Sequence, residues 1–227
     1  MTRPTIVFDL DGTLVDTAPD LLASLNHCLD LAGLKRAEPA ELRRFVGMGG
    51  RVMIERAFAA QRRDLASGQL DELLGVFLDH YTANMPGESR PFQGAVEAVD
   101  RFARAGFTAA ICTNKYERLS VTLITALGLS ERFATICGQD TFAFRKPDPR
   151  HLLETIARVS GSPERAVMIG DSRTDIDTAK AAGIPVVAVD FGYTDQHVSM
   201  FEPSVVISHF DELTTEMVDG LLRQAAA

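Results

Sequence analysis

Short, continuous apolar runs recur along most of the chain and are separated by amphipathic segments. The runs are residues 5–8, 107–112, 134–137, 166–169, 185–189 and 204–207. Continuous rather than alternating apolar runs are typical of strands buried on both faces. The segments 95–105, 116–127 and 174–182 have a helical pattern, and each is followed by a glycine where a helix commonly ends. The alternation predicts an α/β fold, with a parallel sheet covered by helices on both faces.

Residues 17 to 85 interrupt this alternation and contain helical patterns without a strand signal. Thr17 is placed to cap a helix that carries a leucine stripe at Leu21, Leu22, Leu25 and Leu29. Further helices are expected from Pro39 to about Gly47, over about 51–62 and over 70–81. The return segment, 84–91, is rich in Pro and Gly and is typical of a linker. The pattern therefore predicts a helical unit inserted after the first strand.

Composition and charge narrow the classes of function. The chain has 227 residues and a formal net charge of −8, so a broad nucleic-acid-binding face is not expected. No apolar run approaches the roughly 20 residues that a membrane span needs, and the first strand is too short for a signal peptide. Three widely spaced cysteines are typical of free thiols in a reducing cytoplasm. Zinc-hydrolase and serine-hydrolase motifs are absent from the sequence.

Four polar motifs follow predicted strands or lie in the loops after them. They are Asp9-Leu10-Asp11-Gly12-Thr13, Thr113-Asn114-Lys115, Arg145-Lys146-Pro147, and Gly170-Asp171 with Asp175. Ligands bind at the carboxyl ends of strands in open parallel sheets, so these motifs are expected to meet in one crevice. Each motif alone has a plainer interpretation. Asp11-Gly12 is an ordinary turn, residues 146–149 suit a helix start, and Asp175 and Asp177 suit a first helical turn.

The four acids Asp9, Asp11, Asp171 and Asp175 require a counter-charge. Two carboxylates about 4 Å apart repel by roughly 4 kcal/mol at an effective dielectric constant near 20. Ligands that are all oxygen atoms favour a hard cation, and Mg²⁺ is expected. With Mg²⁺ and Lys146 the group carries −4 + 2 + 1 = −1, which is compatible with binding a phosphate.

These residue types fit phosphoryl transfer. Of two acids spaced i, i+2 at a strand end, one can attack phosphorus while the other acts as general acid and base. The expected phosphate-binding groups are the Gly12 backbone N–H, the Thr113 hydroxyl, the Asn114 amide and the Lys146 ammonium. A glycine-rich stretch at 47–50 follows a predicted helix rather than a strand, so it is interpreted as a helix connector.

The four motifs, in this order and across nearly the whole chain, resemble those of the haloacid dehalogenase-like (HAD) hydrolases. The resemblance implies a Rossmann-like parallel-sheet core, residues 1–15 and 88–227, and an inserted all-helical cap, residues 16–87. It implies that Asp9 is the nucleophile and Asp11 the general acid and base. Mg²⁺ would be held by Asp9, by the backbone carbonyl of Asp11 and by Asp171, with Asp175 supporting them. The phosphate would be held by Thr113, Asn114 and Lys146.

Within this family, an acid at position 11 favours phosphate esters over halides, because an alkoxide leaving group needs a proton. Residues 45–51 and 170–175 are similar to those of phosphoglycolate phosphatases. We therefore expect hydrolysis of a small phosphorylated metabolite, 2-phosphoglycolate first, with Arg51 or Lys115 meeting a substrate carboxylate. A sugar phosphatase, a sugar phosphomutase resembling β-phosphoglucomutase, and a pyrophosphatase remain alternatives, and the chain could be a monomer or a homodimer. A phospho-accepting receiver module is disfavoured, because Thr113, not an Asp, follows the second strand.

Overall fold

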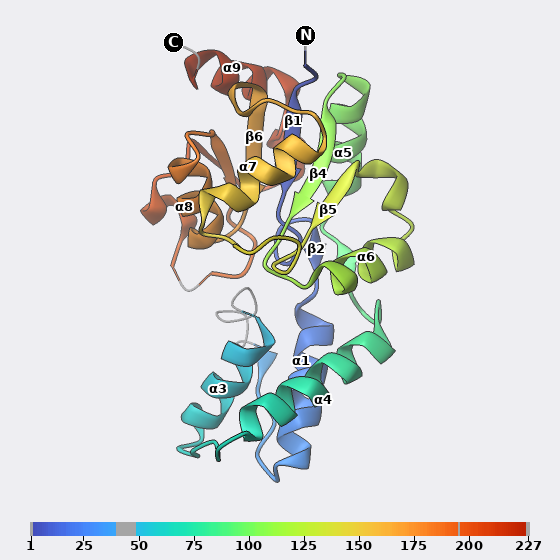
Figure 1. The fold of residues 1–227 in the computed structure, drawn as a ribbon, viewed down its shortest axis with the longest axis vertical. Coiled ribbons are helices and arrows are strands. Elements are labelled where there is room, and N and C mark those ends of the chain that lie inside the picture. Colours follow the sequence, from blue (N-terminus) through green and yellow to red (C-terminus); the bar gives the residue numbers. More distant parts are fainter. Residues whose placement is uncertain (1, 40–48, 195, 226–227) are drawn as a thin grey trace.

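The computed structural model describes residues 2–39, 49–194 and 196–225, and its core is a six-stranded parallel sheet (Figure 1). The strand order is β5-β4-β1-β6-β7-β8. The strands are β1 (Thr5–Phe8), β4 (Thr108–Cys112), β5 (Thr135–Cys137), β6 (Ala166–Gly170), β7 (Val186–Val189) and β8 (Val205–Ile207). Phe8 of β1 is in register with Ile111 of β4 and Ile169 of β6. The predicted parallel α/β sheet is thus confirmed, and β1 lies at its centre.

In the described part of the chain, three helices lie between the first strand and the rest of the sheet. They are α1 (Ala18–Leu31), α3 (Gly50–Ala60) and α4 (Gln69–Asn84), which pack on one another beyond one end of the sheet (Figure 1). Their shared core includes Leu25, Ile54 and Phe77. The helix expected from Pro39 to about Gly47 falls almost wholly outside the described residues.

A short antiparallel pair, β2 (Val15–Asp16) and β3 (Arg90–Pro91), joins the two chain crossings between the sheet and the inserted helices. The sequence did not predict this pair. Two-residue strands are too short for a periodic signal, and Pro91 in β3 suggested a linker instead.

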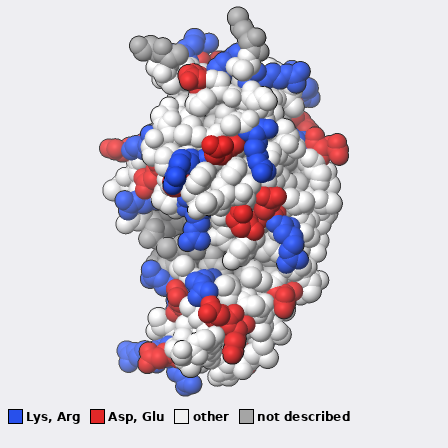
Figure 2. All heavy atoms as spheres, viewed as in Figure 1, with Lys and Arg blue, Asp and Glu red and all other residues white. Residues whose placement is uncertain are grey.

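Charged side chains of both signs are interspersed on the face shown in Figure 2. Among the described residues, no helix is both long and apolar enough to cross a membrane. Cys28, Cys112 and Cys137 are buried free thiols, as expected from their spacing.

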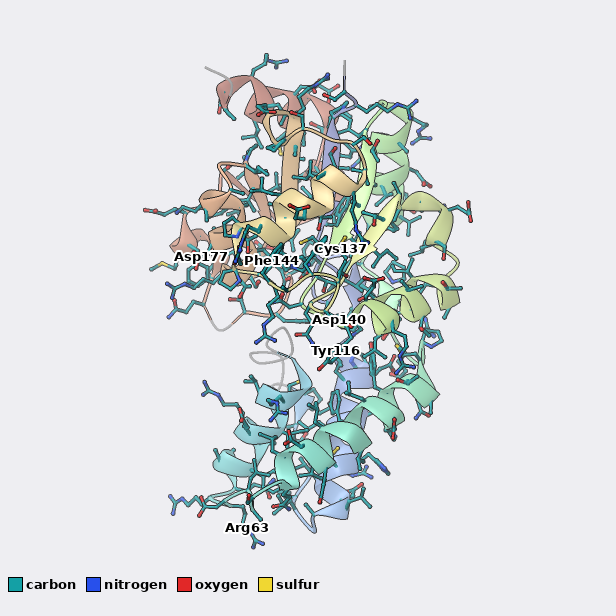
Figure 3. All side chains as sticks on the ribbon, viewed as in Figure 1. Arg63, Tyr116, Cys137, Asp140, Phe144 and Asp177 are labelled. Carbon is teal, nitrogen blue, oxygen red and sulfur yellow. The ribbon has the colours of Figure 1, made fainter. Side chains whose placement is uncertain are left out.

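The inserted helices face the edge of the core where the strands end. Tyr116 and Asp140 lie at this edge, whereas Arg63 lies at the far end of the inserted helices (Figure 3). Asp140 accepts a hydrogen bond from the backbone N–H of Glu117 (2.8 Å), at the start of α6 (Glu117–Ala126). The polar residues at the strand ends therefore lie on the side of the core that faces the insertion.

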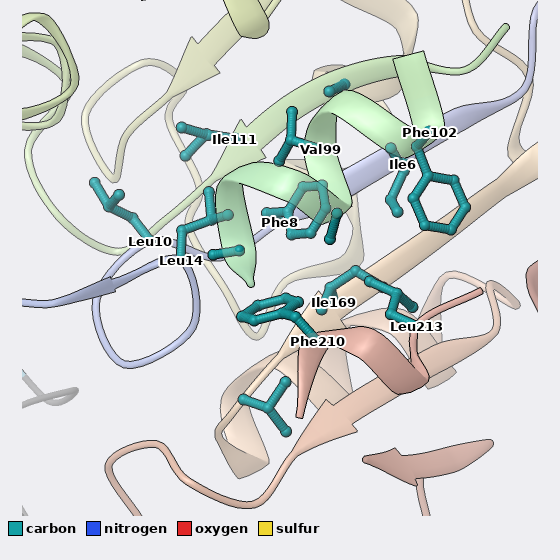
Figure 4. Close-up of a cluster of buried hydrophobic side chains, with 14 of the residues drawn as sticks. Ile6, Phe8, Leu10, Leu14, Val99, Phe102, Ile111, Ile169, Phe210 and Leu213 are labelled. Atoms are coloured by element: carbon teal, nitrogen blue, oxygen red, sulfur yellow. The ribbon is translucent and has the colours of Figure 1, made fainter. Parts of the chain in front are cut away.

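Helices cover both faces of the sheet, and alternate residues of β1 point to different faces. Ile6 and Phe8 pack with α5 (Ala95–Arg104), α6 and α9 (Thr215–Ala225), as part of the cluster shown in Figure 4. Val7 packs with α7 (Pro149–Arg158) and α8 (Arg173–Ala181). Burial on both faces explains why the strands are continuous apolar runs.

Candidate active site

The sheet register brings three of the predicted motifs to neighbouring strand ends. Asp9 follows β1, Thr113 follows β4 and Asp171 follows β6, and β1 lies between the other two strands. The backbone N–H of Asp9 donates to the carbonyl of Ile169 (2.9 Å), and that of Thr113 to the carbonyl of Cys137 (3.0 Å). These bonds extend the ladder past the strand ends, so the backbone fixes where each side chain begins.

Lys146, in the loop between β5 and α7, is buried among the acids. Its Nζ lies 2.8 Å from Asp9 Oδ1 and 2.5 Å from Asp175 Oδ1. Asp9, Asp171 and Asp175 each place a carboxylate oxygen within 4.8 Å of the others, and all three are buried. The structure thus joins residues from three distant parts of the chain into one cluster.

This cluster carries more negative than positive charge, and burying uncompensated charge is unfavourable in free energy. Burial raises the pKa of Asp9 to about 6, with Lys146 opposing the rise and Asp175 adding to it. Burial, Asp175 and Asp9 raise the pKa of Asp171 well above its ordinary value. Three carboxylates and one ammonium leave a net negative charge, which a divalent cation can neutralise. Carboxylate oxygens are the ligands that a hard cation prefers. The residues present therefore fit a bound Mg²⁺.

The backbone around Asp171 and Asp175 holds these two acids in position. Asp171 accepts hydrogen bonds from the Thr13 hydroxyl (2.9 Å) and the Tyr193 backbone N–H (2.6 Å). Asp175 forms a capping box with Ser172 at the start of α8, while its other oxygen contacts Lys146. The helix-start interpretation of Asp175 and the site interpretation are thus both compatible with its position.

Gly12 lies against Asp171, and its backbone is in a conformation that favours glycine. Its φ is +87°, and a Cβ at this position would lie 2.5 Å from Asp171 Oδ2. Any larger residue would therefore be both strained and in collision with the acid.

Asp11 faces the inserted helices. It accepts a hydrogen bond from the Thr17 hydroxyl (2.8 Å), and both of its oxygens lie 3.1 Å from Lys115 Nζ. Thr17 was expected to cap α1 with its side chain. It does precede the helix, but it makes no side-chain cap, because its hydroxyl donates to Asp11.

The second motif lies beside the acids, with Thr113 and Lys115 buried and Asn114 partly buried. The Asn114 amide nitrogen donates to the Lys146 carbonyl (2.9 Å), while the Thr113 hydroxyl accepts from the Lys115 backbone N–H (3.2 Å). The Asn114 side chain thus ties the loop that carries Lys146 to the end of β4.

The candidate Arg51 and the helix-start acid Asp177 lie at the surface of the protein. Arg51, at the start of α3, forms an ion pair with Asp71 of α4, and about half of its side chain is exposed. Asp177 pairs with Arg173 on the outside of α8 (3.2 Å). Neither contact connects these residues to the acidic cluster.

Two cavities lie in the insertion rather than at the acids. One, of about 380 Å³, is lined by α1 and α4 residues that include Asn26, His27 and His80, together with Arg36. The other, of about 220 Å³, lies beside Asp20 and Tyr81. None of the ten candidate residues lines either cavity, so cavity size does not locate the chemistry.

Sequence reasoning missed Tyr193, although the signal was available. Tyr193 follows β7, so the strand-end rule that selected the four motifs also applies to it. Its backbone N–H binds Asp171, its hydroxyl contacts Asp16, and that hydroxyl accepts from the Ala18 backbone N–H (2.9 Å). Tyr193 thus links an acid of the cluster to the chain crossing that leads into the inserted helices.

Comparisons with known proteins agree with this geometry. The family model of haloacid dehalogenase-like hydrolases matches residues 6–189. A phosphoglycolate phosphatase of Mesorhizobium japonicum is 67% identical, covering 99% of both chains, and one of Agrobacterium fabrum is 49% identical, covering 99% of this chain and 96% of its own.

Solved structures share the fold. A predicted phosphoglycolate phosphatase from Haemophilus somnus has a TM-score of 0.87 and 26% identity, covering 94% of this chain and 97% of its own. The protein CbbY from Rhodobacter sphaeroides, solved in complex with phosphate, has a TM-score of 0.81 and 25% identity, covering 96% of this chain and 99% of its own. With its four motifs gathered at the strand ends, the chain belongs to the haloacid dehalogenase-like hydrolase family.

Proposed function

We propose that the chain hydrolyses a small phosphate monoester, 2-phosphoglycolate, to glycolate and inorganic phosphate. The proposed hydrolysis is supported by the buried Asp9 carboxylate, which is bound by Lys146 within the acidic cluster and has Asp11 two residues away. The choice of 2-phosphoglycolate as the substrate is supported by the 67% identity to a protein named phosphoglycolate phosphatase.

In the proposed reaction Asp9 is the nucleophile. A carboxylate oxygen of Asp9 forms a bond to phosphorus as the bond between phosphorus and the leaving oxygen breaks, which gives an aspartyl phosphate. Asp11 donates a proton to the leaving oxygen, so that glycolate departs as an alcohol rather than an alkoxide. Asp11 then takes a proton from a water molecule that attacks the same phosphorus, which releases phosphate and restores Asp9.

The remaining cluster residues bind and neutralise charge. Lys146, the Thr113 hydroxyl, and the backbone N–H groups near Gly12 and Asn114 would hold the phosphoryl oxygens. The Asn114 side-chain amide is already donating to Lys146, so it would position that lysine.

Asp9, the Asp11 carbonyl and Asp171 would hold Mg²⁺, with Asp175 supporting them through Lys146. The ion, when bound, supplies positive charge that offsets the charge developing on the phosphoryl oxygens.

Residues 16–87 would act as a cap over residues 1–15 and 88–227. The contact between Lys115 and Tyr81 of α4 supports this division, because it joins the strand-end edge to the insertion. A cap that closes over the acids would exclude water from the first step and limit the substrate to small molecules.

The test is a Mg²⁺-dependent screen for released phosphate over 2-phosphoglycolate, sugar phosphates, nucleotides and pyrophosphate. We expect the highest kcat/KM with 2-phosphoglycolate. We expect Asp9→Asn to lower kcat by at least about a thousandfold while the protein stays folded. Near-normal rates for Asp9→Asn would contradict the nucleophile assignment. Isomerisation of a hexose phosphate with little phosphate release would instead indicate a mutase.

A further inference from the structure

Tyr81 of α4 has a buried hydroxyl that lies beside the Lys115 ammonium, and within the described part of the chain no group accepts a hydrogen bond from it. The side chain is 1% exposed, and its ring lies 4.3 Å from Lys115 Nζ. Leaving a buried hydroxyl without an acceptor costs stability, so a group of this kind in a native protein calls for an explanation. Its position against a lysine that contacts Asp11 suggests that a ligand supplies the acceptor.

Charge shows which kind of ligand would fit. Lys115 and Lys146 are the two Lys or Arg side chains buried in the described residues. Lys146 is already paired with Asp9 and Asp175, whereas Lys115 has the single carboxylate of Asp11. An ammonium has three N–H donors, and Lys115 Nζ uses two of them to donate to the two carboxylate oxygens of Asp11. The third N–H faces the Tyr81 hydroxyl, which can accept from Lys115 and still donate its own proton. The positive charge of Lys115 and the free proton of Tyr81 are together suited to a second anion.

The Tyr81 hydroxyl remains a donor at neutral pH. Burial raises the pKa of this hydroxyl, and the Lys115 charge opposes the rise without cancelling it. Arg51, the other basic candidate, is exposed and paired with Asp71. A buried donor is worth more to an anion than an exposed one, because water does not compete for it.

We propose that Tyr81 and Lys115 form the subsite that binds the carboxylate of the substrate, and that the Tyr81 hydroxyl selects esters that carry one. The inference rests on the proposed function, because it assigns the non-phosphate end of the same substrate. Tyr81 would then be a specificity-determining residue of the inserted helices. A carboxylate would be bound between Tyr81, from the insertion, and Lys115, from the strand-end edge of the sheet. Substrates without an anion at this end would leave the hydroxyl without an acceptor.

The experiment compares two esters of matched size, 2-phosphoglycolate and 2-hydroxyethyl phosphate, in the wild type, Tyr81→Phe and Tyr116→Phe. Tyr116 lies at the same edge of the core but is exposed, so it controls for the loss of a hydroxyl near the site. We expect Tyr81→Phe to lower kcat/KM for 2-phosphoglycolate by about tenfold or more, and for 2-hydroxyethyl phosphate by less than about twofold. The Tm of Tyr81→Phe should equal or exceed that of the wild type, which a structural role for the hydroxyl would not give.

Equal losses with both esters, or no loss with either, would overturn the inference and leave the proposed function standing. A loss of discrimination in Tyr116→Phe instead would place the carboxylate subsite at the exposed edge near Tyr116 and overturn it too. A wild-type enzyme that did not hydrolyse 2-phosphoglycolate would overturn both the proposed substrate and the subsite.

Discussion

The Thr17 hydroxyl donates a hydrogen bond to Asp11 Oδ1 (2.8 Å), although Thr17 precedes α1 at the position where such a hydroxyl ordinarily caps the helix. The proposed general acid is therefore held by the residue that directly precedes α1, the first of the inserted helices. On its other side Asp11 is held by Lys115, which lies against Tyr81 of α4. The orientation of Asp11 thus depends on where the inserted helices lie relative to the sheet.

We expect Thr17→Val to lower kcat by about tenfold with little change in KM, because the variant loses a bond that orients Asp11 but none that binds phosphate. Thr17→Ser keeps the hydroxyl and should restore most of the rate. Steady-state kinetics with 2-phosphoglycolate measures both. Equal rates for the valine and serine variants would show that the hydrogen bond does not matter.

Lys146→Met should destabilise the protein as well as weaken phosphate binding. Lys146 is the buried counter-charge of Asp9 and Asp175, and removal of one partner from a buried ion pair leaves uncompensated charge. We expect the free energy of unfolding in urea to fall by about 3 kcal/mol or more.

The matched control is Lys180→Met, which removes an exposed lysine that pairs with Glu202 (3.3 Å). Its free energy of unfolding should change by less than about 1 kcal/mol. A Lys146 variant as stable as this control would show that the acids do not need the lysine in the free protein.

The sequence predicted the sheet well because burial on both faces of parallel strands leaves a local signal. β1, β4 and β6 coincide closely with apolar runs, and a glycine with positive φ follows α5, α6 and α8 at Gly106, Gly128 and Gly183. Applied to the predicted parallel sheet, the strand-end rule then placed Asp9, Asp171 and Lys146 together. In the structure Lys146 Nζ lies 2.8 Å from Asp9 Oδ1, and carboxylate oxygens of Asp9 and Asp171 lie within 4.8 Å of each other.

What the sequence could not predict depends on contacts between distant residues. The β2–β3 pair has two residues on each side, and the partners of Thr17 and Tyr193 are set by how the inserted helices pack. Thr17 has the same sequence signature whether its hydroxyl caps a helix or binds Asp11. The sequence did not mark Tyr81 as a site residue, because its proposed role follows from a lysine 34 residues away whose placement only the tertiary structure gives.

Asp20→Ala should destabilise the junction between the sheet and the inserted helices. Asp20 is buried in α1 and accepts hydrogen bonds from the backbone N–H groups of Glu88 (2.8 Å) and Ser89 (3.1 Å) and from the Ser89 hydroxyl (2.5 Å). The variant leaves these donors without an acceptor, so we expect a loss of about 3 kcal/mol in the free energy of unfolding. Amide exchange at Glu88 and Ser89 should become faster.

Asp30→Ala on the same helix is the control for Asp20→Ala. Asp30 is exposed and paired with Arg36 (2.8 Å), so its loss should cost less than about 1 kcal/mol. Similar losses for the two variants would mean that the Asp20 bonds do not hold the junction.

Mg²⁺ should stabilise the folded protein, a result that does not depend on measuring activity. Adding excess Mg²⁺ to protein treated with EDTA should raise the Tm by roughly 5–10 °C, if the ion is present at about 100 times its Kd. In Asp171→Asn the rise should shrink to less than half. Without metal this variant should be more stable than the wild type, because burial and the neighbouring acids disfavour the charge at position 171.

Asp177→Asn serves as the control for a lost carboxylate. Asp177 is exposed and pairs with Arg173, so its variant should keep the full Mg²⁺-dependent rise. An undiminished rise in Asp171→Asn would place the ion elsewhere.

His151 should make the protein less stable as the pH falls. It is fully buried in α7, its Nδ1 accepts a hydrogen bond from the Lys146 backbone N–H (3.2 Å), and burial lowers its pKa to about 4 from 6.5. A base whose pKa is lower in the folded state binds fewer protons there than in the unfolded state. Stability is therefore lost as the pH falls from about 6.5 towards 4, by about 2 kcal/mol between pH 7 and pH 5.

The buried carboxyl of Asp9 works in the opposite direction, because its pKa is raised to about 6, so folding takes up a proton there as the pH falls. His151→Asn separates the two effects, since an amide oxygen can accept the Lys146 bond but does not titrate. Urea unfolding at pH 7 and pH 5 should show that the wild type loses about 2 kcal/mol more than the variant over this interval. If the two proteins lost the same free energy of unfolding between pH 7 and pH 5, protonation of His151 would not destabilise the folded state.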